Sequence, residues 1–387
     1  MTLEKYEKEL SKCVLCGICS RAYFDRIKSF KVCPTREECG FESYDAKGKI
    51  LIARALLKGQ LDYDDKLVKR LYEGCLLCGN CKSICPLGVD TISIFKAMRQ
   101  DMVRMGLGPV EPLKIVDTNV DEKFNVFGED PAKRFVWAKD LNIPKEGETF
   151  YFGGCYDSYR FPQTATAAVK ILNKAGFEVA YLYDDEWCCG APQIADGSIT
   201  VAEKMLKHNV ALLKARGAKR IITSCAGCFH TLKTDYKEIL GEQPFEVFHI
   251  SEIISKLMES GKISLNSDVT RKVTYHDPCH LGRYEGIYDP PRKIIEKISG
   301  VEFVEMLRNR ERAWCCGGGT TEYATFPELA AKIATTRVEE AKTAGAEIIV
   351  TACPLCVSVL RPAAYKEKVE VYDLPVFIAK GMGLEID

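Results

Sequence analysis

The 387-residue sequence predicts an α/β + α protein, in which a mostly helical N-terminal part is followed by two homologous α/β repeats. The first observation is a set of five cysteines that recurs once, with matched positions 124 to 128 residues apart: Cys155, Cys188, Cys189, Cys225 and Cys228, then Cys279, Cys315, Cys316, Cys353 and Cys356. The second is an alternation of apolar strand-like runs with amphipathic helices around both sets. That alternation indicates parallel sheets with helices on their faces, as in Rossmann-like domains.

The composition excludes several functional classes. Basic and acidic residues number 54 each, so no basic excess indicates a nucleic-acid or lipid partner. The charged N-terminus lacks the apolar run of a signal peptide, and the longest uncharged run, Ile348–Leu360, is too short to span a bilayer. The 19 cysteines gather in C-x-x-C units, which favours metal ligation over disulfides. We expect a cytoplasmic iron–sulfur protein without a direct membrane span, and zinc is the alternative metal.

The distribution of cysteines divides the chain into blocks. Residues 1–110 hold two dense cysteine motifs and helical stretches at 47–58 and 91–105. Residues 111–148 contain no cysteine and are predicted to form a partly structured connector. The first repeat covers 149–269, with strands expected at 149–152, 177–183 and 220–224 and helices at 165–175 and 200–216. The second covers 270–387, with strands expected at 272–276, 301–307 and 347–351 and helices at 291–298 and 327–344.

The cysteines of both repeats fall at the C-terminal ends of the predicted strands. Open α/β sheets bind their ligands at that edge. The sequence contains no glycine-rich dinucleotide fingerprint and no phosphate-binding loop. The predicted sheets are therefore expected to present sulfur ligands at this edge.

The N-terminal motifs predict a ferredoxin-like domain. Cys75, Cys78, Cys81 and Cys85–Pro86 have the spacing C-x₂-C-x₂-C-x₃-C-P, in which the fourth cysteine serves the other cluster. The first motif starts alike, but residues 20–32 separate Cys19 from its proline-linked Cys33. We assign one cubane to Cys13, Cys16, Cys19 and Cys85, and the other to Cys75, Cys78, Cys81 and Cys33. Cys39, which no proline follows, is the alternative to Cys33, and its role stays open.

The five-cysteine sets indicate an unusual cluster. Adjacent cysteines such as Cys188 and Cys189 cannot easily converge on one tetrahedral zinc ion, whereas a larger cluster can use both through different irons. Five thiolates also exceed the four that hold an ordinary cubane. Each repeat is therefore predicted to hold one iron–sulfur cluster of a kind that differs from the N-terminal cubanes.

These motifs, with segments 185–190, 224–229, 274–283 and 351–356, give nearly the whole chain a resemblance to the heterodisulfide reductase family, and within it to the D-type subunits, which have cysteine-rich CCG domains. The resemblance implies two noncubane [4Fe–4S] clusters, one per five-cysteine set, besides the two cubanes. It also implies reduction, or reversible formation, of the coenzyme M–coenzyme B disulfide, with electrons delivered through the cubanes. The expected partners are other subunits of a redox complex, either a membrane cytochrome b-type subunit or a soluble flavoprotein.

A second hypothesis follows from related iron–sulfur subunits of glycolate oxidase and anaerobic glycerol-3-phosphate dehydrogenase. On this hypothesis the chain is an electron-transfer subunit between a flavin-dependent hydroxyacid or acyl oxidising partner and a membrane quinone pool. The completeness of both five-cysteine sets favours disulfide reduction. The insertion at 20–32 departs from the tight first motif of the resembled family, so we expect a different surface near one cubane.

Three further side chains are candidate catalytic residues. Reduction of a disulfide consumes two protons, and His276 and His280 flank Cys279. We predict that one of them protonates a product thiolate or donates a hydrogen bond to a cluster sulfur. The alternative is a histidine that backbone groups satisfy at the end of a strand. Arg283 is predicted to pair with an anionic group of the substrate, and the alternative is a surface ion pair.

Overall fold

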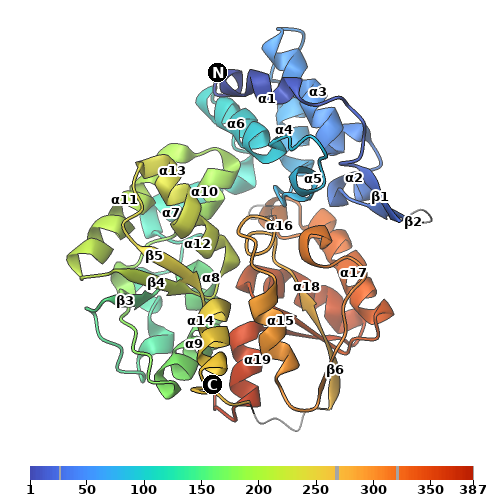
Figure 1. Cartoon of the computed structure of the whole chain (residues 1–387). Coiled ribbons are helices and arrows are strands. Elements are labelled where there is room, and N and C mark those ends of the chain that lie inside the picture. Colours follow the sequence, from blue (N-terminus) through green and yellow to red (C-terminus); the bar gives the residue numbers. More distant parts are fainter. Residues whose placement is uncertain (26–27, 266–269, 320–321, 387) are drawn as a thin grey trace.

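The computed structural model describes residues 1–25, 28–265, 270–319 and 322–386, and these form three lobes (Figure 1). The N-terminal lobe, blue to cyan in Figure 1, lies above the two repeats, of which the first is green to yellow and the second orange to red. Among the described residues, no helix combines the length and the apolar character needed to cross a bilayer.

The N-terminal lobe consists mainly of short helices. Aspartate side chains at Asp45, Asp64 and Asp90 accept the first free backbone N–H groups of three of these helices, which fixes where each begins. The insertion at 20–32 contains an antiparallel hairpin. The elements are η1 (Leu3–Tyr6), α1 (Glu7–Ser11), β1 (Arg21–Asp25), β2 (Lys28–Lys31), α2 (Pro34–Cys39), η2 (Glu42–Tyr44), α3 (Ala46–Leu57), α4 (Asp65–Glu73), α5 (Asn80–Ser83) and α6 (Thr91–Arg104).

The predicted connector contains a regular helix. Its elements are α7 (Glu111–Lys123), η3 (Pro131–Lys133) and η4 (Val136–Ala138). The segment packs on the first repeat, where Trp137 lies against the rings of Tyr151 and Tyr181. It is therefore an integral part of that lobe.

The first repeat is built on a parallel sheet of strand order β3-β4-β5. Its elements are β3 (Thr149–Tyr151), α8 (Gly154–Tyr159), α9 (Pro162–Lys174), η5 (Tyr183–Asp185), α10 (Ala191–Asp196), α11 (Ile199–Ala215), β4 (Arg220–Thr223), α12 (Ala226–His230), the π-helix η6 (Thr231–Asp235), α13 (Tyr236–Leu240), β5 (Glu246–His249) and α14 (Ile250–Glu259). The strand β5 and the helix α14 were not predicted from the sequence.

The second repeat is built on a parallel sheet of strand order β7-β6-β8-β9. Its elements are β6 (Arg271–His276), α15 (Asp289–Glu296), β7 (Val301–Phe303), η7 (Arg310–Arg312), α16 (Glu322–Thr325), α17 (Pro327–Thr343), β8 (Ile348–Thr351), α18 (Pro354–Lys366), β9 (Glu370–Asp373) and α19 (Leu374–Gly381). Both sheets are parallel and carry helices, as the alternating pattern predicts.

One predicted strand is wrong. The segment 177–183 forms a single bridge, between Phe150 and Ala180, instead of a ladder. The N–H of Tyr181, one residue further, donates instead to the carbonyl oxygen of Pro144 at 2.9 Å. The chain then enters η5 at Tyr183, whose φ of +57° is incompatible with a strand. The pairing with β3 thus stops after Ala180, because the chain turns into η5.

The two repeats contact each other through equivalent helices. Helix α9 of the first repeat packs on α19 of the second, and α15 of the second packs on α14 of the first. Figure 1 shows α9, α14, α15 and α19 along the centre of the molecule. Helix α9 occupies the position in the first repeat that α15 occupies in the second, and α14 corresponds in the same way to α19. Because both contacts therefore pair the same two positions, the repeats are related by an approximate two-fold axis, which brings their cysteine-bearing edges together.

Candidate metal centre

A cavity, which with its opening to solvent encloses about 700 Å³ of empty space, lies between the two repeats. Its walls include nine of the ten repeat cysteines, contributed by both repeats: Cys155, Cys188, Cys189, Cys225, Cys228, Cys279, Cys316, Cys353 and Cys356. The tenth, Cys315, is buried beside the cavity and faces the N-terminal lobe through a contact described below. The two predicted five-cysteine sets therefore meet on one shared space.

The ends of the strands place these cysteines. Cys225 follows β4 and is the N-cap residue of α12, and Cys353 follows β8 and is the N-cap residue of α18. Cys155 lies in α8, directly after β3, and Cys279 follows β6. Since the strands of each sheet are parallel, their carboxyl ends meet at one edge, and the thiols gather there.

The cysteine pairs are held by tight turns. The glycines that follow them, Gly190 and Gly317, have φ values of +85° and +96°. Residues other than glycine rarely adopt this backbone conformation. A Cβ atom at Gly317 would lie 2.4 Å from the carbonyl oxygen of Ala330. In each turn a backbone N–H donates to a ligand sulfur, from Gly190 to Cys188 at 3.5 Å and from Gly318 to Cys316 at 3.4 Å.

The thiols contact one another within and between the repeats. The sulfurs of Cys189 and Cys228 are 3.4 Å apart, and the thiols of Cys225 and Cys353 interact across the two repeats. Hydrogen bonds from Cys188 and then Cys228 lower the pKa of Cys189 to about 5. No cysteine of the described chain forms a disulfide, and no carboxylate lines the described part of the cavity. This soft donor set fits iron–sulfur ligation.

The N-terminal cysteines line two separate cavities. The first has walls from Cys13, Cys16, Cys19, Cys81 and Cys85. The second has walls from Cys33, Cys75, Cys78 and Cys81. Each cavity thus brings together the four cysteines that the crossed assignment gives to one cubane. Cys39, at the end of α2, lines a different surface hollow with Glu38 and Glu73.

Arg283 joins the N-terminal lobe to the second repeat. Its Nε donates to the carbonyl oxygen of Cys78 at 2.7 Å, and its Nη1 donates to that of Ala313 at 2.6 Å. The thiols of Cys78 and Cys315 interact across the same boundary between the lobes. Both hydrogen bonds from Arg283 go to backbone and not to the surface carboxylate of the alternative, and the pairing of Arg283 with a substrate anion stays a prediction. Because the packing of one lobe against another brings two carbonyl oxygens to the guanidinium, Arg283 has a structural position.

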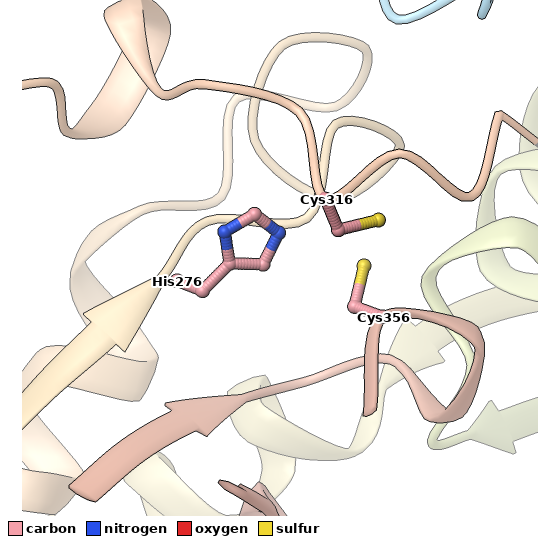
Figure 2. Close-up of side chains that lie close together, drawn as sticks. All are labelled: His276, Cys316 and Cys356. Carbon is pink, nitrogen blue, oxygen red and sulfur yellow. The ribbon is translucent and has the colours of Figure 1, made fainter. Parts of the chain in front are cut away.

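The two candidate histidines have different surroundings. His280 lines the shared cavity, its Nδ1 lies 3.5 Å from the sulfur of Cys279, and its ring stacks on Tyr284 at 4.6 Å. Burial lowers the pKa of His280 to about 4, so the imidazole is neutral at pH 7. His276 is buried behind Cys316 and accepts a hydrogen bond from Arg337 (Figure 2). Within the described part of the chain, neither ring has a hydrogen bond to a backbone group of the kind that the alternative interpretation requires.

A buried ion pair was not predicted from the sequence. Arg134, from the connector, lies 2.9 Å from Glu186 and 3.9 Å from the sulfur of Cys155. Glu186 also accepts the N–H groups of Gly153 and Gly154, the turn that leads into Cys155. Nothing in the spacing around Arg134 signals this role. The position of Glu186, two residues before the cysteine pair, is the one signal that could have suggested it.

Comparison with known proteins assigns these lobes. The family described as "Cysteine-rich domain" matches residues 149–233 and 273–361, and the family described as "4Fe-4S dicluster domain" matches residues 9–89. The second description favours iron over the zinc alternative. A crystal structure of a hypothetical protein from Helicobacter pylori shares the fold, with a TM-score of 0.61 and 13% identity over 99% of this chain and 76% of that chain.

Two curated relatives bear on the family. EtfAB:quinone oxidoreductase of Syntrophomonas wolfei is 29% identical over 331 residues, which cover 80% of this chain and 46% of that protein. The D-type subunit of dihydromethanophenazine:CoB–CoM heterodisulfide reductase of Methanosarcina acetivorans is 34% identical over 405 residues, which cover 98% of this chain and 95% of that protein. With its dicluster domain and two cysteine-rich domains, this chain belongs to the family of D-type heterodisulfide reductase subunits.

Proposed function

We propose that this chain is the iron–sulfur catalytic subunit of an oxidoreductase complex that reduces, or reversibly forms, the disulfide of coenzyme M and coenzyme B. The observation that carries the proposal is the cavity whose walls include nine of the ten cysteines of the two sets. Similarity over nearly the full length of the heterodisulfide reductase relative supports the same substrate.

The proposal includes two cubane and two noncubane [4Fe–4S] clusters. The eight N-terminal thiols around two cavities suit the cubanes, and the ten thiols of the repeats suit two five-thiolate clusters. When bound, such clusters supply electrons one at a time together with iron that has affinity for thiolate sulfur. The interaction of the thiols of Cys225 and Cys353 in one cavity supports a placement in which one disulfide reaches both sets at once.

The side chains of the cavity would orient the disulfide and exclude water. Val126, Tyr156 and Leu355 contribute apolar walls, which suit the aliphatic carbons beside a disulfide. The reaction adds two electrons and two protons to the S–S bond and releases two thiols. Among the described residues that line the cavity, His280 supplies the imidazole. In the proposal its ring forms a hydrogen bond to a product sulfur.

A partner protein would supply the electrons. Cys16 is exposed at the surface of the first N-terminal cavity, and the apolar side chains of Val14 and Leu87 are exposed close to it in sequence. An exposed cluster edge with apolar side chains suits docking of a redox partner, either a membrane cytochrome b-type subunit or a soluble flavoprotein. In this proposal the chain works in the cytoplasm and reaches a membrane through that partner.

A second candidate function has support from one relative. The similarity to EtfAB:quinone oxidoreductase favours a chain that passes electrons between a flavin-dependent oxidising partner and a membrane quinone pool. That function needs the same clusters but no disulfide in the shared cavity. The two candidates are therefore separated by what the cavity binds.

The test is thiol release by the anaerobically purified, iron-loaded chain. With a reduced viologen dye and the coenzyme M–coenzyme B disulfide, we expect one molecule of each thiol for every two electrons consumed. Cys189→Ser and Cys316→Ser, one in each repeat, are expected to abolish release, and Cys39→Ser is the control that retains it. Release by the wild-type chain at the level of Cys316→Ser would overturn the proposal and favour the electron-transfer function.

A further inference from the structure

We propose that Arg337 fixes His276 as a hydrogen-bond donor to Cys316 and thereby raises the reduction potential of the second-repeat cluster. Arg337 is a positioning residue in this proposal, because it acts on Cys316 through the imidazole. The inference rests on the proposed ligation of that cluster by Cys316. It concerns the tuning of the cluster rather than the identity of the substrate.

The hydrogen bond between Arg337 and His276 determines where the imidazole carries its hydrogen. Arg337 lies on α17 and His276 ends β6, and both side chains are buried. The Nε of Arg337 donates to the Nδ1 of His276 at 3.0 Å. A guanidinium can donate hydrogen bonds but cannot accept them, so Nδ1 must be the acceptor. In the neutral imidazole the hydrogen is then on Nε2.

The hydrogen on Nε2 lies on the cysteine side of the ring. Figure 2 shows one ring nitrogen of His276 on the side of Cys316 and Cys356, whose sulfurs lie close to each other beyond it, and the other nitrogen on the far side of the ring. The ligand atoms of the three residues lie within 4.8 Å of one another, which places the Nε2–H group of His276 beside the sulfurs of Cys316 and Cys356.

This arrangement decides between two roles for His276. One histidine and two cysteines so close together could be three ligands of a metal ion. An Nε2 atom that carries hydrogen has no lone pair to offer to a metal, so ligation by His276 conflicts with the bond from Arg337. The geometry instead suits an N–H donor to the Cys316 thiolate.

Arg337 is itself held in place by charge. Its Nη1 donates to the Oε2 of Glu340 and to the carbonyl oxygen of Arg308, both at 2.7 Å. Glu340 also accepts a 2.6 Å hydrogen bond from the Nε of Arg308. The guanidinium is thus fixed by a carboxylate and a carbonyl on the side away from the imidazole. A donor fixed in this way loses little freedom when the reduced, more negative cluster strengthens the hydrogen bond.

The first repeat lacks this pair. By strand register, Tyr151 and Tyr275 pair with equivalent residues of β4 and β8, so Phe152 stands at the position of His276. Helices α11 and α17 are both 17 residues long, and Asn209 stands at the position of Arg337. Asn209 donates to the carbonyl oxygen of Cys188 at 3.1 Å, so this hydrogen bond goes to the backbone of the cysteine and not to its sulfur.

The reduction potentials of the two clusters should therefore depend on different residues. A hydrogen bond to a thiolate ligand stabilises the reduced, more negative cluster and raises its potential. The first repeat has a different donor, the guanidinium of Arg134, 3.9 Å from the sulfur of Cys155. The potential of the second-repeat cluster therefore depends on His276, and that of the first does not.

A redox titration of the iron-loaded full chain, followed by electron paramagnetic resonance (EPR), tests this. His276→Phe, which copies the first repeat, is expected to shift the second-repeat cluster to a lower potential with iron content unchanged. Arg337→Met should cause a smaller shift in the same direction, because the imidazole is then free to place its hydrogen on Nδ1. His276→Gln, whose amide N–H replaces Nε2–H, is expected to restore most of the potential.

Phe152→Leu is the matched control in the first repeat and should leave the second-repeat potential unchanged. A full complement of iron with an unshifted potential in His276→Phe overturns the inference while leaving the proposed function intact. If His276→Phe fails to load iron, an unshifted potential in Arg337→Met overturns it instead. A wild-type chain whose second repeat binds no iron would overturn both the inference and the proposed function.

Discussion

The Nε atom of Arg283 donates a 2.7 Å hydrogen bond to the carbonyl oxygen of Cys78, which lies 205 residues earlier in the chain. The same guanidinium donates to Ala313, just before the pair Cys315–Cys316. One side chain therefore ties an N-terminal cluster motif to a ligand loop of the second repeat. Electrons that enter through the N-terminal motifs would cross to the repeats at this contact in the proposed function.

Arg283→Met should destabilise the contact between these lobes. Removal of the guanidinium leaves two carbonyl oxygens without their donor, and we expect a loss of about 2–4 kcal/mol in the free energy of unfolding. Arg310→Met, which removes an exposed ion pair with Asp289, should cost less than about 1 kcal/mol and is the control. Denaturant unfolding of both variants gives the comparison, and equal midpoints would contradict the assigned role.

Arg134→Met should be among the most destabilising substitutions of the first repeat. It leaves the carboxylate of Glu186 buried without its cation, and breaking a buried pair in this way costs roughly 3–5 kcal/mol. The matched control is Arg160→Met, since Arg160 pairs with Glu129 at the surface. Thermal unfolding should show a large decrease in midpoint for the first variant and a small one for the second. A stable Arg134→Met protein would show that Glu186 is neutral.

Gly317→Ala should disrupt the turn after the second cysteine pair. Any L-residue at a left-handed position costs about 1–2 kcal/mol, and at Gly317 the added Cβ also collides with the backbone of Ala330. Gly286 has a φ of +73° with open space around it, so Gly286→Ala isolates the cost of the backbone conformation. We expect Gly317→Ala to lose iron from the second repeat and Gly286→Ala to retain it. Iron analysis after reconstitution checks this pair.

The cysteines at the two ends of α2 should differ in whether iron binding depends on them. Cys33 stands at the start of α2 beside Cys75, and Cys39 ends the same helix outside both N-terminal cluster cavities. Cys33→Ser is therefore expected to lose a cubane, seen as missing iron and a missing cubane signal by EPR. Cys39→Ser should keep both. The reverse result would assign the fourth ligand to Cys39.

His280→Phe should slow disulfide reduction while the clusters remain. Loss of one hydrogen bond to a product sulfur is worth roughly 1.4 kcal/mol, so thiol release should fall about tenfold or more. His208, whose Nε2 contacts the carbonyl oxygen of Asp185 away from the cavity, provides the control His208→Phe. Unchanged thiol release in His280→Phe, with iron content equal to wild type, would remove His280 from the reaction.

The spacing of cysteines predicted much of this site because it reports directly on strand ends. Cys225 and Cys353 each follow a short apolar strand, and parallel pairing then forces such positions to one edge. The same reasoning failed at 177–183, where Ala180 makes one bridge before Tyr183 takes a left-handed backbone conformation. No alternation of apolar residues encodes that turn.

The residues that surround the sulfurs were harder to predict than the sulfurs. Arg134 and Arg337 lie far in sequence from Cys155 and Cys316, and each reaches its partner only through tertiary packing. Arginines are common on surfaces, so neither stands out before the fold is known. The flanking histidines were visible in the sequence, but the different surroundings of His276 and His280 depend on which side of the β6 end each faces.

The EPR spectrum of the iron-loaded chain, poised part-way through its reduction, tests the central claim most directly. If the two five-cysteine sets bind the disulfide in their shared cavity, adding the coenzyme M–coenzyme B disulfide should produce a paramagnetic signal that neither cubane gives. That signal should disappear in Cys189→Ser and in Cys316→Ser while the cubane signals persist. A spectrum that the disulfide leaves unchanged, in a chain with its full complement of iron, would contradict the account.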